Sequence, residues 1–291
     1  MSAEGARREW TATVHGTELR VEEEGTGPET VVFSPALFTN RELFDPVVAA
    51  LRDDYRCIRY DHRGQGDSGF GAPQPSPHLL GTEGLYDDAV ALLDQLGVES
   101  CHFVGASIGG FVGMRLAARQ PKRVRSLVLI GPSMRRLSRT DLRQIAMFSW
   151  VLRLSHPLGR VGLAVRRRLT ERVIRNMFGA TFMSDPARAE DREAWRQRYF
   201  AQLAPKAVPV IREVFGHPGT SPELLAQIKA PTLLLVGDNP PAGVDPAVAA
   251  AEDREIQRVI PGSQLVTIPG AGHMVLVEQP EAGTAAITGF I

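Results

Sequence analysis

The sequence has few cysteines, no signal-like leader and no long apolar run. Its 291 residues include only two cysteines, Cys57 and Cys101, which lie in separate apolar segments without CxxC spacing. We therefore expect buried free thiols, no metal centre and a reduced, cytoplasmic setting. The first ten residues, MSAEGARREW, lack the apolar core of a signal peptide, and no apolar stretch reaches the ~18 residues that cross a bilayer.

The sequence also has no excess of charge of either sign. Its 33 Lys and Arg residues balance 33 Asp and Glu residues, which argues against a nucleic-acid or membrane partner. Apolar residues make up 43% and charged residues 23%, as in an ordinary globular protein, and no internal repeat is present. We expect a small-molecule substrate and a monomer or homodimer.

Short apolar segments closed by Gly, Pro or Asp recur along the chain. Those at 30–34, 56–60, 101–105, 126–131, 231–237 and 264–270 are typical of strands buried on both faces. Helical patterns separate most of them, so the sequence predicts an α/β fold with a mostly parallel central sheet flanked by helices. Residues 10–25 alternate across a His-Gly turn and predict an antiparallel hairpin at the sheet edge.

The strand–helix alternation stops between about residues 134 and 225. This segment is helical in pattern and rich in arginine, as at Arg166, Arg167 and Arg168. We expect a core domain formed by residues 1–133 and 226–291, with residues 134–225 inserted as a helical cap.

Ser107 lies in the sequence GASIG (residues 105–109), which follows an apolar strand and precedes a helix. A nucleophilic serine has to protrude from a sharp, strained turn, and glycines two residues before and after it avoid a collision there. The first turn of the next helix leaves N–H groups free, and its dipole favours a developing oxyanion. This context predicts that Ser107 is a nucleophile.

A serine hydroxyl needs a base to act as a nucleophile. His273 stands apart from the other six histidines, because it lies in a Gly-rich loop between the last strand and the C-terminal helix. Such a loop can bring the imidazole over the carboxyl edge of the sheet, where Ser107 is expected. We therefore predict that His273 is the base.

These segments resemble an α/β-hydrolase-fold serine hydrolase along nearly the whole chain. RYDHRGQGDSG (59–69) is similar to the D-x-R-G-x-G-x-S loop of that family, the region around Ser107 to its nucleophile region, and IPGAGHMVLVEQPE (268–281) to its histidine loop. Among subgroups, the chain looks most like capped bacterial esterases and enol-lactone hydrolases. The family pattern makes Asp61 a structural residue.

The resemblance implies an oxyanion hole built from the backbone amides of Leu37 and Ile108. The family usually carries His-Gly after the third strand, whereas this chain has Pro35-Ala36 there. Backbone donors survive side-chain changes, and Pro35 is not at the expected donor position. We therefore expect the oxyanion hole to persist, in a loop whose shape differs from the usual one of the family.

The carboxylate that orients the histidine is the second departure from the family pattern. The family places it about three residues after the glycine that ends the strand before the last, and Pro240 occupies that place. Asp238 lies at the strand end and is the preferred candidate. Asp245 lies beyond a Pro-rich insertion, where it also reads as a helix N-cap, and it remains the alternative.

The predicted function is hydrolysis of a carboxylic ester or lactone through an acyl-enzyme, with no metal or organic cofactor. The same triad in this fold also resembles that of carbon–carbon bond hydrolases and cofactor-free peroxidases. A slow-turnover ligand-sensing regulator is an alternative of another class. Candidate pocket-lining residues from the cap are Met147, Phe148, Trp150, Met177, Phe178 and Phe182.

Overall fold

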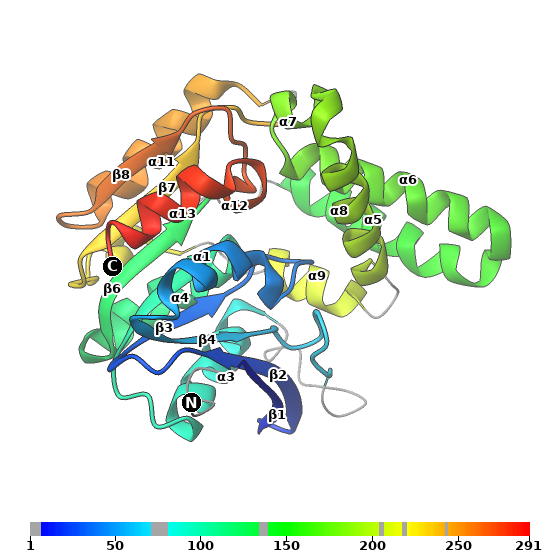
Figure 1. Ribbon diagram of the computed structural model, residues 1–291. Coiled ribbons are helices and arrows are strands. Elements are labelled where there is room, and N and C mark those ends of the chain that lie inside the picture. The colour runs from blue at the N-terminus through cyan, green and yellow to red at the C-terminus, as the bar shows by residue number, and fades with distance from the viewer. Residues whose placement is uncertain (1–6, 71–80, 134–138, 204–206, 217–219, 242–243) are drawn as a thin grey trace.

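An eight-stranded sheet forms the centre of the molecule, in the strand order β1-β2-β4-β3-β5-β6-β7-β8 (Figure 1). This computed structural model describes residues 7–70, 81–133, 139–203, 207–216, 220–241 and 244–291. Neighbouring strands from β4 to β8 run parallel, and β2 pairs antiparallel with β1 and β4. The expected mostly parallel sheet is confirmed. The strands are β1 Arg8–Val14, β2 Thr17–Glu24, β3 Glu29–Ser34, β4 Tyr55–Tyr60, β5 Cys101–Ala106, β6 Val124–Ile130, β7 Thr232–Gly237 and β8 Gln264–Ile268.

The central strands are buried on both faces, as their unbroken apolar sequences predict. Every residue of β5 is buried, and six of the seven residues of β6 are. The same expectation was wrong for β8, in which Gln264 and Thr267 are exposed. This strand pairs only with β7 and forms the edge of the sheet, so part of its surface meets solvent.

Helices pack on both faces of the sheet (Figure 1). On one face α3 packs against α4, and α4 contacts β5 and β6; on the other, α1 packs against α13. These helices and the short turns beside them are η1 Arg41–Phe44, α1 Asp45–Leu51, α3 Thr82–Gln95, α4 Ile108–Arg119, η2 Pro121–Arg123, α11 Pro246–Val259, α12 Val275–Glu278 and α13 Pro280–Thr288.

The chain between β6 and β7 contains helices and no strand wherever the structure describes it. These helices lie together on the right of Figure 1, and the turn between α5 and α6 extends farthest from the sheet. We call residues 139–225 the helical segment. It comprises α5 Arg139–Ser155, η3 His156–Leu158, α6 Gly159–Met177, α7 Ala180–Ser184, η4 Pro186–Arg188, α8 Ala189–Gln202, α9 Ala207–Gly216 and α10 Pro222–Leu225.

The two cysteines and the N-terminal hairpin behave as the sequence indicates. Cys57 and Cys101 are buried free thiols, and burial raises the pKa of each to about 12. The β1–β2 hairpin turns at His15 and Gly16, whose φ angles of 45° and 70° fit the tight turns that join antiparallel strands.

No helix in the described ranges is both long and apolar enough to span a membrane.

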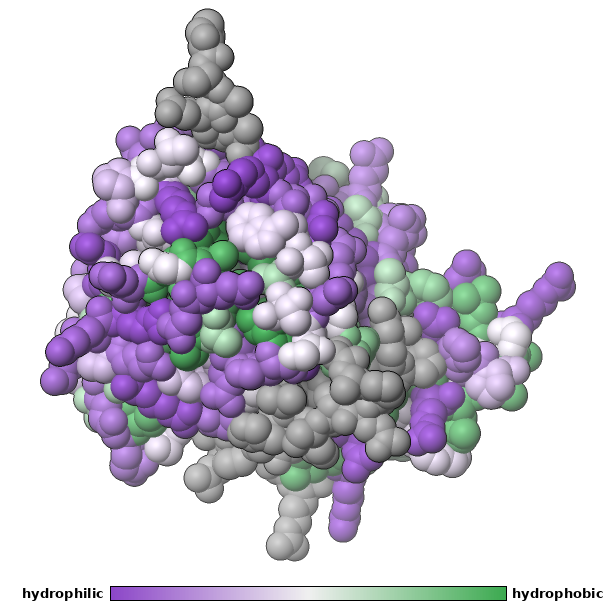
Figure 2. Space-filling view, turned by 90° about the horizontal axis from the view of Figure 1, so that it is seen from below, coloured by the Kyte–Doolittle hydropathy of each residue, from purple (hydrophilic) through white to green (hydrophobic). Residues whose placement is uncertain are grey.

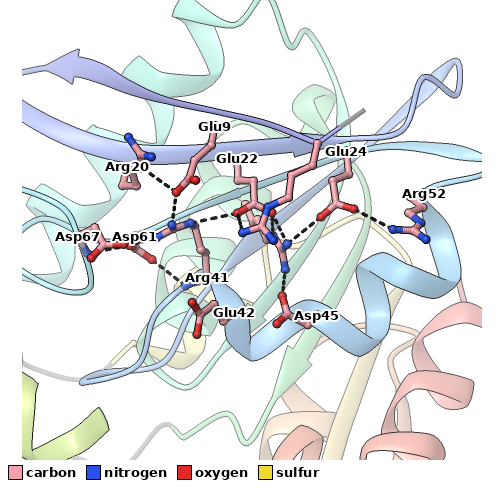
Figure 3. Close-up of polar contacts among 12 residues, drawn as sticks. Glu9, Arg20, Glu22, Glu24, Arg41, Glu42, Asp45, Arg52, Asp61 and Asp67 are labelled. Atoms are coloured by element: carbon pink, nitrogen blue, oxygen red, sulfur yellow. Dashed lines mark hydrogen bonds and ion pairs between the residues drawn. The ribbon is translucent and has the colours of Figure 1, made fainter. Parts of the chain in front are cut away.

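Buried charged side chains join this hairpin to β4 and η1 (Figure 3). Glu22 on β2 accepts hydrogen bonds from Arg59 on β4 at 2.8 Å and from Arg41 on η1 at 3.3 Å. The guanidinium of Arg41 also donates to Asp61 at 2.7 Å. Asp61 in turn accepts the backbone N–H groups of Arg41 and Asp67 at 2.7 and 2.9 Å. These contacts fix the loop after β4 to the segment after β3, the structural role that the family resemblance implies for Asp61.

Candidate active site

Ser107 occupies a sharp turn between β5 and α4. Its φ and ψ angles are 50° and −110°, a conformation that L-residues rarely adopt. A Cβ on Gly105 would lie 2.3 Å from the carbonyl oxygen of Gly109, and one on Gly109 would lie 2.0 Å from that of Ser34. Only glycine fits at both positions, so the local packing explains the spacing of the GASIG sequence.

His273 lies in the loop between β8 and α12, as the sequence predicts. A Cβ on Gly131, just after β6, would lie 2.9 Å from Nδ1 of His273, so the imidazole packs directly against the end of that strand. Burial lowers the pKa of His273 from its ordinary value. The ring is therefore neutral at pH 7 and able to accept a proton.

Ser107 and His273 line the same small, mainly apolar pocket. The structure thus brings together two residues that lie far apart in the sequence, although no hydrogen bond joins their side chains in the described part of the chain. The complete lining is Ala36, Leu43, Ala106, Ser107, Ile130, His273, Met274, Val275 and Leu276.

The six candidate lining residues from the helical segment are absent from this pocket. Phe178 and Phe182 are buried and stacked on each other, with ring centroids 4.9 Å apart. Met147 and Trp150 are exposed. These side chains therefore do not line the small pocket beside Ser107, and their contact with a substrate stays a prediction.

A buried glutamate, Glu278, supports the loop that carries His273. Its carboxylate accepts the backbone N–H groups of Gly272 and Met274, the two neighbours of His273, at 3.0 and 3.1 Å. It also accepts the N–H of Gly179, from the helical segment, at 2.9 Å. Burial raises the pKa of Glu278, and the three amides partly offset this effect. Sequence reasoning missed this residue.

The helical segment makes further contacts with the histidine loop. Arg188 donates to the carbonyl oxygens of Val277 and Glu278 at 2.7 and 3.0 Å, at the end of α12. The hydroxyl of Tyr199, on α8, lies 3.8 Å from the sulfur of Met274. The position of the His273 loop therefore depends on residues from the helical segment.

The two candidate acids lie where the sequence predicts, one at the end of β7 and one at the start of α11, and each accepts a hydrogen bond from a backbone amide. Asp238 follows β7 and accepts the N–H of Gly270 at 2.7 Å. Asp245 is the N-cap of α11 and accepts the N–H of Ala247 at 2.8 Å. Neither carboxylate is hydrogen-bonded to His273 within the residues the structure describes, so the choice between them stays a prediction.

The loop after β3 carries the first predicted oxyanion donor, Leu37. A turn closes this loop, in which Thr39 N–H donates to the carbonyl of Ala36 at 3.2 Å. Phe38 has a φ of 62°, and its N–H donates to the side-chain oxygen of Gln65 at 2.8 Å. The second predicted donor, Ile108, is the first residue of α4. The roles of Leu37 and Ile108 stay predictions.

His62 supports this loop through a hydrogen bond to its backbone, a role that sequence reasoning also missed. Its Nε2 lies 3.0 Å from the carbonyl oxygen of Pro35, which can only accept, so Nε2 carries the proton and donates. Ser34 also contacts His62 and the hydroxyl of Tyr60, at 3.3 and 3.1 Å. Burial lowers the pKa of His62 to about 4, so the ring stays neutral in the native protein at pH 7.

The site has no grouping of His, Cys, Asp and Glu that would hold a metal ion, as far as the described residues go. The groups that the structure brings together here are a serine hydroxyl and a neutral imidazole beside an apolar pocket, with the first backbone amides of α4 nearby. This set of groups suits attack on a carbonyl carbon.

Comparisons with known proteins agree with this architecture. A curated relative from Caulobacter sp. (strain K31), named "Putative carbamate hydrolase RutD", is 28% identical over 266 residues, 90% of each chain. The solved structure of an enol-lactonase from Burkholderia xenovorans LB400 has a TM-score of 0.79 at 25% identity, covering 96% of this chain and 98% of that one. A thermophilic esterase from Thermogutta terrifontis also has a TM-score of 0.79, at 27% identity, covering 98% and 97%.

The model of a protein family described as having the alpha/beta hydrolase fold matches residues 29–280, most of the chain. The match begins at β3 and ends at the start of α13, so it includes Ser107, His273 and both candidate acids. The chain therefore belongs to the α/β-hydrolase family.

Proposed function

We propose that this protein is a serine hydrolase that cleaves a carboxylic ester or lactone through an acyl-enzyme on Ser107. The observation that carries the proposal is the shared pocket of Ser107 and His273, with the serine on a strained turn and the imidazole kept neutral by burial. The esterase and the enol-lactonase among its structural neighbours support the substrate class.

In the proposed mechanism, His273 takes the proton of Ser107 as the serine oxygen bonds to the carbonyl carbon. The backbone amides of Leu37 and Ile108 stabilise the oxyanion. When the intermediate collapses, the carbon–oxygen bond to the leaving group breaks and His273 protonates the alkoxide. Water, deprotonated by the same imidazole, then attacks the acyl-enzyme and releases the acid. Asp238, or alternatively Asp245, orients the imidazole.

The helical segment acts in this proposal as the cap that shapes the substrate pocket, with boundaries near residues 134 and 225. Support comes from its contacts with the histidine loop through Gly179, Arg188 and Tyr199. A cap that packs on the loop carrying the base can select substrates and keep water from the reacting atoms.

Hydrolysis of p-nitrophenyl acetate tests the proposal. We expect turnover in the native protein and a loss of about 10⁴-fold or more in kcat for Ser107→Ala and for His273→Ala. Ser184→Ala is the matched control, because Ser184 is exposed on α7 and bonds only to carbonyls of its own helix. An equal rate in Ser107→Ala and the native protein would exclude Ser107 as the nucleophile.

Labelling with a fluorophosphonate separates a catalyst from a sensor. Labelling of Ser107 together with rapid ester turnover supports the hydrolase. Slow labelling without turnover would favour the ligand-sensing regulator, and no labelling at all would overturn the assignment of Ser107. Separate Asp238→Asn and Asp245→Asn variants identify the acid, because the true one should lose orders of magnitude in kcat.

Hydrolysis of a carbamate is a second candidate function. The relative from Caulobacter, matched over 90% of each chain, carries that activity in its name. The same serine can attack a carbamate carbonyl, with His273 as the base and the backbone amides stabilising the oxyanion. A comparison of kcat/KM for matched p-nitrophenyl acetate, a lactone and a carbamate decides between them, since the preferred class has the highest value.

A further inference from the structure

Exposed apolar side chains are concentrated on one part of the helical segment. Of the nine large hydrophobic residues that are exposed in the described chain, seven lie between positions 142 and 163. Trp150 and Val161 are 64% and 66% exposed. The seven are Leu142, Met147, Trp150 and Leu154 on α5, Leu158 on η3, and Val161 and Leu163 on α6. We call α5, η3 and α6 together the helical hairpin (139–177).

Helix α5 is apolar on two opposite faces. Met147, Trp150 and Leu154 follow the i, i+3, i+7 spacing of one helix face. Ser149 and Leu152 are buried and mark the opposite face, where α5 packs against α6 and α9. A helix with two apolar faces is normally covered on both sides. In this structure the face that carries Trp150 is uncovered.

The helical hairpin is also strongly basic in a protein with no net charge. It contains nine arginines against two acidic residues, and α6 alone carries six arginines and one glutamate. Glu171 pairs with Arg175 and Arg196. Among the described residues, no ion pair joins Arg143, Arg153, Arg160, Arg168 or Arg172 to a carboxylate, whereas the charge of Arg167 helps to lower the pKa of Glu193. The balance of the whole chain therefore hides a local excess of positive charge.

The shape of the helical hairpin makes this surface accessible. Its tip, at η3, lies farthest from the sheet in Figure 1, and hydrophobic and hydrophilic residues intermingle on the projecting part at the right of Figure 2. At about 1.5 Å per residue, the 19-residue α6 is about 28 Å long. A flat surface can therefore meet the hairpin without contact with the core.

We propose that the helical hairpin docks on the surface of an anionic lipid bilayer, with Met147, Trp150 and Leu154 in the interfacial region and the arginines on the headgroup phosphates. Tryptophan favours the boundary between headgroups and acyl chains, and arginine side chains extend toward phosphates while their stems stay in apolar surroundings. Each arginine near an anionic surface adds electrostatic attraction.

Charge decides against a second copy of this chain as the occupant. A two-fold dimer through the Trp150 face would bring the same surface from both copies together and place two arginine-rich helical hairpins side by side. Like charges repel there, whereas an anionic bilayer neutralises them. The expectation of no membrane partner rested on the net charge of the whole chain, whereas this proposal rests on the local distribution of the charge.

Co-sedimentation of the full chain with vesicles tests the proposal. We expect binding to vesicles that contain about 30% phosphatidylglycerol to be at least about tenfold tighter than binding to pure phosphatidylcholine. We expect about 0.5 M salt to weaken it strongly, because the Debye length falls to a few Å. No binding to either vesicle, or equal binding without salt dependence, would overturn the proposal.

Two variants separate the apolar and the basic contributions. Trp150→Gln with Leu154→Gln, and Arg160→Gln with Arg167→Gln and Arg168→Gln, should each weaken binding by about tenfold or more. Val248→Gln is the matched control, because Val248 is 63% exposed on α11, outside the hairpin, and its loss should leave binding unchanged. Ester hydrolysis and thermal unfolding show whether each variant is folded.

Sedimentation of the protein alone gives the competing outcome. A native dimer that becomes monomeric in the Trp150→Gln, Leu154→Gln variant would mean that the apolar face is an interface between two copies and would refute lipid docking. A monomer that binds anionic vesicles, and a Ser107→Ala variant that binds them equally well, would support lipid docking independently of catalysis.

Discussion

Replacing Glu278 by glutamine tests whether its carboxylate holds the loop that carries His273. The two carboxylate oxygens accept three backbone N–H groups, those of Gly179, Gly272 and Met274. Glutamine offers one oxygen and an NH₂ group, so at least one of these amides would face another donor. The native loop then contains an unsatisfied buried N–H.

The size of the effect follows from these three bonds. A hydrogen bond to a charged group contributes about 1.5–3 kcal/mol to stability. Glu278→Gln removes one such bond, and the two that remain are weaker because the glutamine side chain carries no charge. We expect Glu278→Gln to lower the free energy of unfolding by about 3 kcal/mol, and the Tm by about 6 °C. Since two of the amides flank His273, kcat/KM for a p-nitrophenyl ester should fall about 10- to 100-fold.

Urea unfolding followed by circular dichroism and steady-state kinetics give the two readouts. Glu281→Gln is the control, because it makes the same chemical change at an exposed position three residues along, at the start of α13. Its free energy of unfolding should stay within about 0.5 kcal/mol of that of the native protein. If Glu278→Gln also stays within that range and keeps full activity, the carboxylate does not position the loop.

Three further predictions concern glycine packing and histidine titration. Gly109→Ala should abolish folding or fluorophosphonate labelling, because its Cβ would meet the Ser34 carbonyl, whereas Gly110→Ala, whose nearest contact is 3.5 Å, should keep both. The acid limb of kcat/KM should lie below the ordinary histidine pKa of about 6.5, because burial lowers the pKa of His273; a limb above it contradicts the base. His62 has a folded pKa of about 4, below its ordinary value of about 6.5. Its contribution to the free energy of unfolding is therefore fully present above about pH 6.5 and is lost as the pH falls through 4. Between pH 7 and 5, the free energy of unfolding, measured in urea, should fall by about 2 kcal/mol less in His62→Asn than in the native protein. An equal fall in the two proteins would refute this prediction.

Much of the fold and part of the site could be predicted from sequence, because periodicity and punctuation are local signals. The apolar runs predict β3 to β7 within a few residues, and the glycines around Ser107 predict the turn that the structure contains. Strand order places His273 at the same sheet edge, and the shared pocket agrees. Each of these features depends on residues that are neighbours in the chain.

The features that sequence missed depend on contacts between distant residues. Glu278 looks like any glutamate near a helix end, and only the fold brings the amide of Gly179 to it. His62 stands in a recognisable loop, but nothing in the sequence indicates that the Pro35 carbonyl lies 3.0 Å away. The exposure of Trp150 was missed for the same reason, since helical periodicity identifies an apolar face without saying what covers it.

The buried ion pairs of the N-terminal edge have a consequence for the response to heat. Glu22, Arg41, Arg59 and Asp61 are each at most 4% exposed. The hydration of charged groups becomes less favourable as temperature rises, so the cost of removing these groups from water falls, while hydrophobic stabilisation per unit area levels off. The β1–β2 edge should therefore retain amide protection at temperatures where the helical segment has begun to exchange. Heat would loosen this protein from the helical segment inward, with the N-terminal hairpin among the last parts to open.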